Sequence, residues 1–239
     1  MNATPQPPGW YDDPDDGGQL RYWDGNQWTA DRSPKAGAPA VAQPQVLVGP
    51  EDYPVHLDVD YQEEYNRWLP LVKWLLLFPH YIVLAFLGIA GLAVWIVAAF
   101  AILFTGRYPE GMFNFLVGVQ RWAMRVTGYH LLMTDEYPPF SLDATAGQTV
   151  RYDVEYPEQG VERWRPFVSW LLVYPYLFIA NVLVYVGGIL AFIALFAILF
   201  TKRYPQSLFD FNLVALRWSV RGTAYAYAMA TRYPPWTWA

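Results

Sequence analysis

The sequence predicts a mainly α-helical integral membrane protein: a duplicated helical membrane unit with short β-strands, preceded by a small N-terminal antiparallel β module. Two apolar runs are long enough to cross a bilayer, a long block recurs, and the N-terminus carries tryptophans between turn signals. The expected segments are a Trp-rich β module at 1–32, a Pro/Ala-rich tether at 33–52, membrane unit 1 at 53–140, a linker at 141–147 and membrane unit 2 at 148–239.

The two apolar runs decide the broad class of the protein. The first extends from Leu69 to Phe104 and the second from Pro166 to Phe200. Apart from tyrosines, the first contains only Lys73 and His80 as ionisable residues, and the second contains none. A helix needs roughly 20 apolar residues to cross a hydrocarbon core of about 30 Å. Since a chain of 239 residues has no soluble shell to cover two such runs, we expect a multi-pass protein of the plasma membrane.

A long block of the sequence occurs twice, at an offset of 96 positions. Arg67-Trp68 returns as Arg163-Trp164, and the residues FAILFT that begin at Phe100 return unchanged from Phe196. Further matched pairs are Arg107 with Arg203, Tyr108-Pro109 with Tyr204-Pro205, Arg121 with Arg217, Arg125 with Arg221, and Tyr137-Pro138-Pro139 with Tyr233-Pro234-Pro235. Self-similarity at a fixed period indicates a repeated structural unit, so we expect two copies of one fold.

Each unit contains the same elements in the same order. It opens with a strand, Val55–Val59 or Val150–Val154, in which apolar residues occupy alternate positions. After the apolar run, the sequence Arg-Tyr-Pro ends the helix, because proline disfavours a helical conformation in the residue before it. A third segment, 113–133 or 209–229, is helical with a mixed surface, and its two arginines at a spacing of four lie on one face. The two strands can pair as a small sheet.

Three membrane arrangements of each unit remain open. In the first, the long run is a tight hairpin of two short spans that turns near Gly88–Gly91 or Asn181–Gly187. In the second, only the later part of the run crosses, and the part before the central proline lies in the interface. In the third, the mixed helix crosses as well. We favour the hairpin because it places the arginines beside the membrane on one face, and the positive-inside rule makes that face, with the N-terminus, cytoplasmic.

The sequence of the N-terminal module predicts a miniature antiparallel sheet. Its aromatic residues bracket the turn signals Asp16-Gly17-Gly18 and Asp24-Gly25. The tryptophans form the core of so small a domain, and they can also form a groove for a proline-rich peptide of a cytoplasmic protein. The candidate peptide-binding residues are Trp10, Tyr22, Trp23 and Trp28. The Pro/Ala-rich segment that follows is an extended tether.

Two families resemble parts of this chain. The motif from Pro8 to Thr29, with Gly9-Trp10-Tyr11, Asp13-Pro14, Arg21-Tyr22-Trp23-Asp24-Gly25 and Trp28-Thr29, resembles a short family of unknown function at the N-termini of many actinobacterial membrane proteins. The two units, with FAILFTGRYP or FAILFTKRYP, then Arg-Trp, then EYPPF or RYPPW, resemble a second bacterial membrane family of unknown function. Neither resemblance implies an activity. The second copy departs from the first at Asn181, Asp210 and Arg232.

The residue types present exclude several kinds of chemistry. The chain has no cysteine, which rules out disulfides and thiolate catalysis. It carries no metal-ligand motif, phosphate-binding glycine loop or nucleophile motif, so we expect no catalytic residues, no cofactor, no metal and no enzyme activity. Asp58, Asp60, Asp153 and Glu155 are interpreted as a solvated strand face. Nucleic-acid binding is excluded because no basic cluster is interleaved with aromatic residues.

Arginines recur at matching positions in both units. The candidate residues for contact with lipid headgroups or other anions are Arg107, Arg121, Arg125, Arg203, Arg217 and Arg221. Beside a membrane such side chains extend to the interface and can bind anionic headgroups. We therefore expect a non-enzymatic membrane scaffold or membrane-organising protein, whose tethered N-terminal module recruits a cytoplasmic partner. The alternative is a small transporter or channel component with an arginine-lined path.

Overall fold

The computed structural model describes residues 9–13, 16–24, 26–34, 53–145 and 147–238. The chain divides into two compact units, Met1–Gln45 and Val46–Ala239. In the N-terminal unit, three antiparallel strands follow one another in the sheet: β1 (Gly9–Asp13), β2 (Asp16–Trp23) and β3 (Trp28–Pro34). The predicted N-terminal sheet is thus confirmed. Residues 35–52, which make up most of the expected tether, lie outside the described residues.

The larger unit contains the two predicted repeats, and each consists of one strand and three helices. The first repeat has β4 (Val55–Val59), α1 (Leu69–Leu76), α2 (Phe78–Thr105) and α3 (Glu110–His130). The second has β5 (Val150–Val154), α4 (Arg165–Leu172), α5 (Tyr174–Thr201) and α6 (Gln206–Ala226). A proline lies in the first turn of each of the helices α1, α2, α4 and α5. Proline is tolerated there because the first helical N–H groups have no partner within the helix.

Each long apolar run forms a short helix followed by a long one, with no turn at the predicted positions, so the predicted hairpin is wrong. α2 continues through Gly88–Gly91 and α5 through Asn181–Gly187 without a break. Glycine within a helix costs only about 1 kcal/mol relative to alanine, and neither stretch contains a proline. The helices end instead before the predicted Arg-Tyr-Pro breaks. There Gly106 and Lys202 adopt left-handed conformations, with φ values of 71° and 60°.

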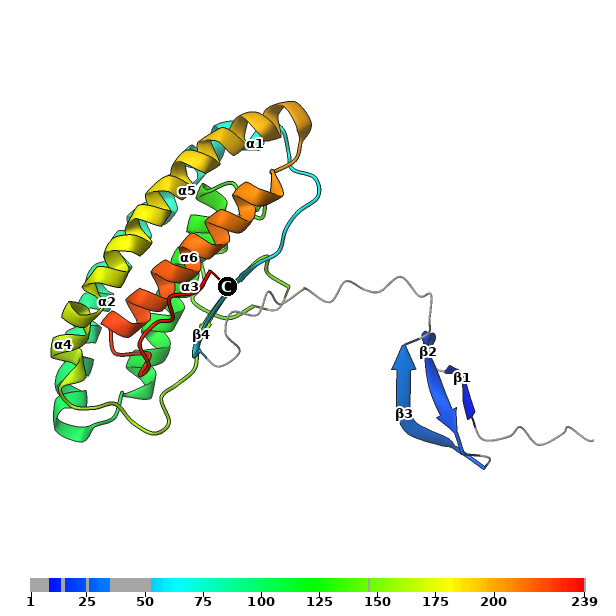
Figure 1. The fold of residues 1–239 in the computed structure, drawn as a ribbon, viewed down its shortest axis with the longest axis horizontal. Helices are drawn as coiled ribbons and strands as arrows, with labels where there is room; N and C mark the ends of the chain where they lie inside the picture. The colour runs from blue at the N-terminus through cyan, green and yellow to red at the C-terminus, as the bar shows by residue number, and fades with distance from the viewer. Residues whose placement is uncertain (1–8, 14–15, 25, 35–52, 146, 239) are drawn as a thin grey trace, which may run out of the picture. The chain divides into compact units, whose positions relative to one another are not determined.

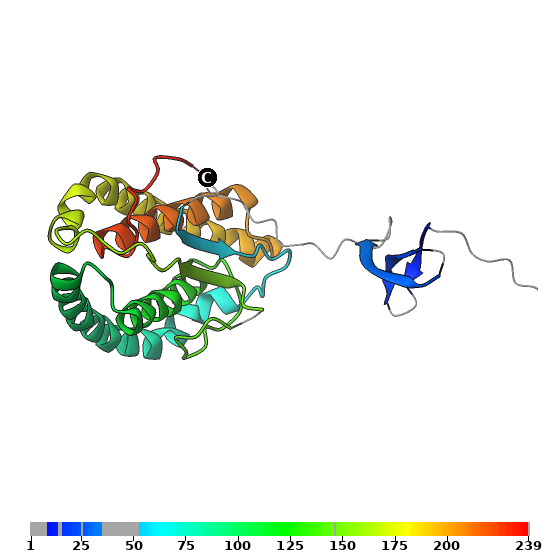
Figure 2. The same cartoon turned by 90° about the horizontal axis from the view of Figure 1, so that it is seen from below.

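The elements of the two repeats form three layers (Figure 1). α3 packs between α2 and β5, and α6 packs between α5 and β4. Figure 2 shows the paired strands between the α2–α3 pair and the α5–α6 pair. The predicted pairing of the strands is confirmed: β4 and β5 are antiparallel, with Leu57 opposite Tyr152. Their inward side chains form the centre of the core: Val55, Leu57, Val59, Val150, Tyr152 and Val154.

The two repeats run in opposite directions. The Tyr65 N–H donates to the Lys202 carbonyl at 2.9 Å, so the start of the first repeat lies beside the end of α5. The equivalent bond, from the Val161 N–H to the Gly106 carbonyl, is also 2.9 Å long and joins the start of the second repeat to the end of α2. α2 and α5 are therefore antiparallel, and an approximate twofold axis relates the repeats through the centre of the β4–β5 sheet.

Candidate functional site

Four of the predicted arginines lie between the helices α3 and α6 and the β4–β5 sheet. Arg121 and Arg125 lie one turn apart on α3, and Arg217 and Arg221 lie one turn apart on α6. Arg125, Arg217 and Arg221 are buried, and Arg121 is half-buried. The predicted common face of each pair is therefore turned towards the interior of the protein.

Arg121 joins α3 to the strand that opens the second repeat. Its Nε donates to the Tyr152 carbonyl at 3.0 Å, and its Nη2 donates to the Asp153 carboxylate at 2.9 Å. Its remaining terminal nitrogen donates to the Leu142 carbonyl at 2.9 Å. One side chain of the first repeat thus holds both the backbone and a carboxylate of β5.

Arg217 makes the equivalent contacts from α6. Its Nε donates to the Leu57 carbonyl at 2.9 Å, and its Nη2 donates to the Asp58 carboxylate at 2.9 Å. Leu57 and Asp58 belong to β4, which opens the first repeat. Each repeat therefore binds the strand of the other, and these two arginine clamps make the strand exchange reciprocal.

Arg125 and Arg221 lie beside the clamps and support the segments that lead into the strands. Arg125 donates to the Ser141 carbonyl at 3.1 Å and to the Asp143 carbonyl at 2.6 Å. The Arg221 guanidinium lies 6.0 Å from the centre of the Tyr53 ring. Burial lowers the pKa of both guanidinium groups from the ordinary arginine value. Both residues are only 4% exposed, so little of either side chain reaches water.

Arg107 and Arg203 are the two candidate arginines that remain exposed. Each follows directly after a long helix, and its backbone N–H donates to the hydroxyl of the last helical threonine. Contact with lipid headgroups stays a prediction. Among the six candidate arginines, only Arg107 and Arg203 are exposed enough for a headgroup to reach them. The other four side chains contact the protein's own strands and loops.

The strand carboxylates are at least partly open to solvent, as predicted, and they also pair with basic side chains. In addition to the two clamps, Arg151 donates to the two oxygens of Asp60 at 2.6 and 2.7 Å, which raises the pKa of Arg151. Glu155 lies 3.2 Å from the His56 ring. Matched acids on the strands and matched arginines on the helices were the available sequence signal. Nothing in the sequence shows that they combine across repeats.

Lys73 is a buried cation whose role is not evident from the sequence. Its side chain lies on α1 and is 1% exposed. The Nζ donates to the Thr134 carbonyl at 2.7 Å, lies 2.8 Å from the Asp135 carboxylate, and lies 4.6 Å from the centre of the Tyr129 ring. A carbonyl, a carboxylate and an aromatic face together compensate the lost hydration of the ammonium group.

A cleft of about 430 Å³ lies beside the sheet and contains both signs of charge. Its charged and polar lining includes His56, Asp58, Arg121, Arg125, Arg151 and Asp153. Most of these groups already bond to one another or to the backbone, as described above. Within the described ranges, no three His, Asp or Glu side chains come together as metal ligands would.

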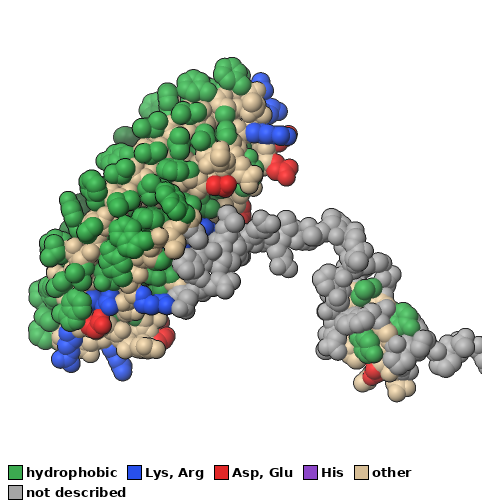
Figure 3. Space-filling model, in the orientation of Figure 1, with side chains coloured by type: hydrophobic (Ala, Val, Ile, Leu, Met, Phe, Trp, Pro, Cys, Tyr) green, Lys and Arg blue, Asp and Glu red, His purple; other side chains and the backbone are tan. Residues whose placement is uncertain are grey.

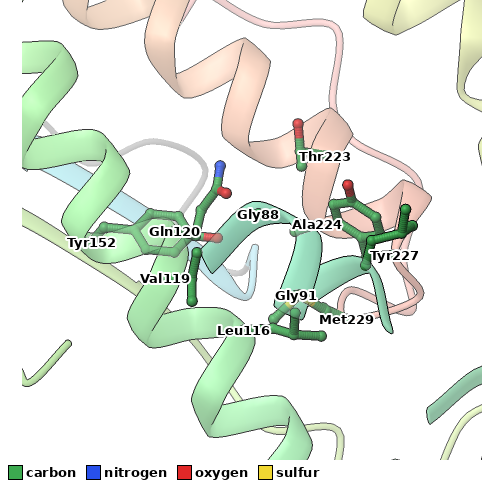
Figure 4. A pocket seen from close by; sticks show the side chains of 11 residues that line it. Gly88, Gly91, Leu116, Val119, Gln120, Tyr152, Thr223, Ala224, Tyr227 and Met229 are labelled. Carbon is green, nitrogen blue, oxygen red and sulfur yellow. The ribbon is translucent and has the colours of Figure 1, made fainter. Parts of the chain in front are cut away.

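A second, mostly apolar cavity of about 110 Å³ lies where α2, α3 and α6 approach the sheet (Figure 4). Gly88 and Gly91 of α2 form one wall, and Thr223 of α6 lies on another with Tyr227, the residue that follows α6. Tyr152, from the middle of β5, also lines it. Ligand pockets usually measure about 300–1,000 Å³, so this cavity is too small for a typical organic cofactor.

In the N-terminal unit, described aromatic side chains gather at the β2–β3 hairpin. The rings of Trp23 and Trp28 meet edge to face with their centres 5.2 Å apart, and Tyr11 lies 6.4 Å from Trp28. Asp24 accepts two backbone N–H groups in the turn, at 2.7 Å each. Tyr22, Trp23 and Trp28 are each half-buried. The side chain of Trp10, the fourth predicted peptide-binding residue, lies outside the described part of the chain.

The long helices carry a continuous apolar surface (Figure 3). α2 and α5 turn small residues inward, among them Gly91, Ala98, Ala180, Gly187, Ala191 and Ala194. Large apolar residues point outward along both helices. The segments Leu69–Thr105 and Tyr174–Thr201 are long and apolar enough to cross a membrane, and 17% and 22% of their most apolar stretches are buried. Basic side chains lie at the two ends of this surface (Figure 3).

Comparison with known families identifies the two parts of the chain separately. The family described as Domain of unknown function (DUF4389) matches residues 68–141 and again residues 163–237, well over half of the chain. The chain belongs to the DUF4389 family. In this DUF4389 protein, each match begins where α1 or α4 begins and includes the arginine-bearing helix. Residues 8–41 match a second family, Protein of unknown function (DUF2510). Neither the curated proteins nor the solved structures contain a significant match.

Proposed function

We propose that this DUF4389 protein is a non-enzymatic membrane scaffold that holds its N-terminal sheet at the cytoplasmic face of the plasma membrane. The observation that carries the proposal is the exposed apolar surface of α2 and α5, combined with internal use of the repeated charges. Arg121 and Arg217 bind the strands of the opposite repeat. Charged residues that hold the fold together support a structural role, and the apolar surface supports a lipid environment.

Two orientations keep the apolar surface in lipid. α2 and α5 can each cross the bilayer once, as the expected multi-pass protein would, or both can lie within one leaflet. Arg107 and Arg203 lie at the ends of this surface and are placed to meet anionic headgroups in either case, at about 1 kcal/mol each.

The N-terminal sheet provides the recruiting part of the proposed scaffold. Trp23 and Trp28 are each half-buried, and their rings meet edge to face. Half-buried tryptophans and a tyrosine on a small sheet are suited to a proline-rich peptide, which binds in an extended conformation. A cytoplasmic protein with such a segment is the proposed partner.

A transporter or channel component is the second candidate, and the cleft beside the sheet favours it. Arg121, Arg125 and Arg151 line this cleft. Their existing bonds to Asp153, to backbone carbonyls and to Asp60 oppose it, because a transported anion would have to replace them. Anion flux through reconstituted vesicles, lost on replacement of Arg151 by Gln, would establish this alternative.

Flotation of the purified chain with liposomes tests the membrane assignment. We expect the full chain and a variant without residues 1–45 to float equally well, since the apolar surface lies in the larger unit. Only the full chain should retain immobilised proline-rich peptides, and Trp23→Ala should weaken that binding. A full chain that stays at the bottom of the gradient would refute the membrane scaffold, and a deletion variant that retains the peptides would refute the recruiting role.

A further inference from the structure

The apolar surface is longer than the hydrocarbon core of a bilayer is thick. α2 and α5 each contain 28 residues, which corresponds to about 42 Å at 1.5 Å per residue. Exposed apolar side chains reach both ends of the helices: Phe78 and Phe104 on α2, and Tyr174 and Phe200 on α5. The hydrocarbon core measures about 30 Å. An upright helix would therefore leave exposed apolar side chains outside the hydrocarbon.

The polar sheet lies level with the middle of the long helices. Tyr152, at the centre of β5, lines the same cavity as Gly91, which lies midway along α2 (Figure 4). The neighbouring carboxylates are open to solvent, with 69% of the Asp153 side chain and 70% of the Glu155 side chain exposed. In an upright orientation these carboxylates would lie at the depth of the bilayer centre, where charged groups are strongly disfavoured.

We infer that α2 and α5 lie in the plane of a single leaflet, with the apolar layer immersed and the β4–β5 sheet facing water. The inference rests on the membrane assignment proposed above and specifies its geometry. A helix with its side chains is about 10–12 Å thick, which fits half of a hydrocarbon core of about 30 Å. The whole length of both helices then lies in lipid, and the approximate twofold axis stands normal to the membrane.

The charges around the apolar surface agree with this orientation. Arg107 and Arg163 lie at one end of the long helices, and Arg67, Lys202 and Arg203 lie at the other. Two crossing helices would place these groups on opposite faces of the bilayer. In-plane helices place both groups at the headgroup level of the same leaflet, where anionic lipids attract them. The partner of this surface is therefore one lipid leaflet.

Sidedness provides the first test, and the repeat supplies a matched pair of positions. The chain has no cysteine, so Arg107→Cys and Arg203→Cys each introduce a single thiol at equivalent exposed sites. A membrane-impermeant maleimide applied to spheroplasts and to inverted vesicles should label both variants from the same side. Glu155→Cys, at the residue that follows β5, should be labelled from that side as well. Labelling of Arg107→Cys and Arg203→Cys from opposite sides would overturn the inference and leave the membrane scaffold intact.

Depth along α2 provides a second test that does not depend on access from water. Ile82, Ile89 and Ile96 are exposed and lie seven residues apart on one face of α2. Each is replaced by cysteine, labelled with a fluorophore and reconstituted in vesicles that contain lipids with quenchers at defined depths. In-plane helices give the same quenching profile at all three positions. In an upright helix centred at Gly91, Ile82 would lie about 10 Å shallower than Ile89 and Ile96 about 4–5 Å shallower, and that profile would overturn the inference.

Discussion

The two repeats share a fold, but each compensates a buried cation in its own way. In the first repeat, Lys73 lies 4.6 Å from the centre of the Tyr129 ring. In the second repeat the equivalent ring is Tyr225, and the guanidinium of Arg165 lies 5.3 Å from its centre. Arg165 does not occupy the position of Lys73, because the residue equivalent to Lys73 is Ser169. The cation comes from one helical turn earlier.

This difference shows that the ring, and not the residue beside it, is the fixed part of the arrangement. One helical turn is about 5.4 Å, a distance that a long lysine or arginine side chain can span. The first repeat satisfies its cation more completely, through Thr134 and Asp135. In the second, Arg165 pairs with Glu162, but one Nη of Arg165 and the Ser169 hydroxyl have no hydrogen-bond partner among the described residues.

A matched aromatic cluster differs in a similar way. His80 accepts a bond from the Trp122 indole at 3.1 Å and stacks on Phe140 with the ring centres 3.9 Å apart. In the second repeat, Tyr176 replaces the histidine and stacks on Trp218 at 4.8 Å. The Trp218 indole donates instead to a backbone carbonyl at 2.8 Å. Both clusters close the same corner of the fold by packing, while the hydrogen bonds are free to change.

Separating the repeats should have the largest effect. Because α3 binds β5 and α6 binds β4, fragments 46–147 and 148–239 each lack the strand that their own clamp arginine holds. We expect neither fragment to accumulate as a folded monomer, and we expect the two to copurify when they are expressed together. Size-exclusion chromatography in detergent measures this. A single fragment that elutes as a folded monomer would contradict the strand exchange.

Removing the clamp arginines one at a time should destabilise the protein by different amounts in the two repeats. Loss of one partner from a buried ion pair costs about 3–5 kcal/mol, so Arg217→Leu should lower the free energy of unfolding by that amount. Arg121→Leu should cost less, because its partner Asp153 is 69% exposed, whereas Asp58, the partner of Arg217, is 30% exposed. Thermal unfolding in detergent compares the two variants, with Arg203→Leu as the exposed control. If all three variants lost the same stability, the two clamps would not differ from each other or from an exposed arginine.

The buried cation of the first repeat can be moved from position 73 to position 69, one helical turn earlier. Lys73→Ser leaves the Asp135 carboxylate and the Thr134 carbonyl without their ammonium partner, which should cost about 3 kcal/mol. Adding Leu69→Arg reproduces the position used in the second repeat, and we expect it to restore part of the loss by placing a guanidinium against Tyr129. Unfolding by denaturant measures both variants. If the double variant is no more stable than the single variant, the Tyr129 ring does not by itself make a favourable site for a buried cation.

The equivalent glycines of the long helices should show the smallest difference. A Cβ at Gly187 would lie 2.2 Å from the Asn212 side-chain oxygen, whereas a Cβ at Gly91 would lie 3.4 Å from a Leu116 methyl group. Gly187→Ala should therefore destabilise the protein by about 1–3 kcal/mol. Gly91→Ala should be neutral or stabilising by about 0.5–1 kcal/mol. Thermal unfolding in detergent measures both variants. Adding Asn212→Leu should restore the stability that Gly187→Ala loses. If stability is not restored, the contact with the Asn212 oxygen is not the cause of the loss.

The sequence predicted the elements better than their contacts. The repeat, the paired strands and the ends of the long helices at Gly106 and Lys202 follow from local signals that each segment carries by itself. The hairpin was wrong because isolated glycines were given the weight of a turn. The clamps could not be predicted because duplication makes both strands equally suitable partners: Asp58 and Asp153 occupy equivalent positions. Only the three-dimensional arrangement distinguishes a repeat that binds its own strand from one that binds the strand of the other.

The strand exchange also sets the order in which the chain can mature during translation. Leu57 and the arginine that binds its carbonyl are 160 positions apart. β4 is therefore synthesised early, and its partner strand β5 follows about 95 positions later. The Arg217 contacts to Leu57 and Asp58 can form only after α6 has been made. Because contacts of long sequence separation form slowly, a chain that stops before α6 can pair its two strands but lacks the arginine that holds β4 to the second repeat.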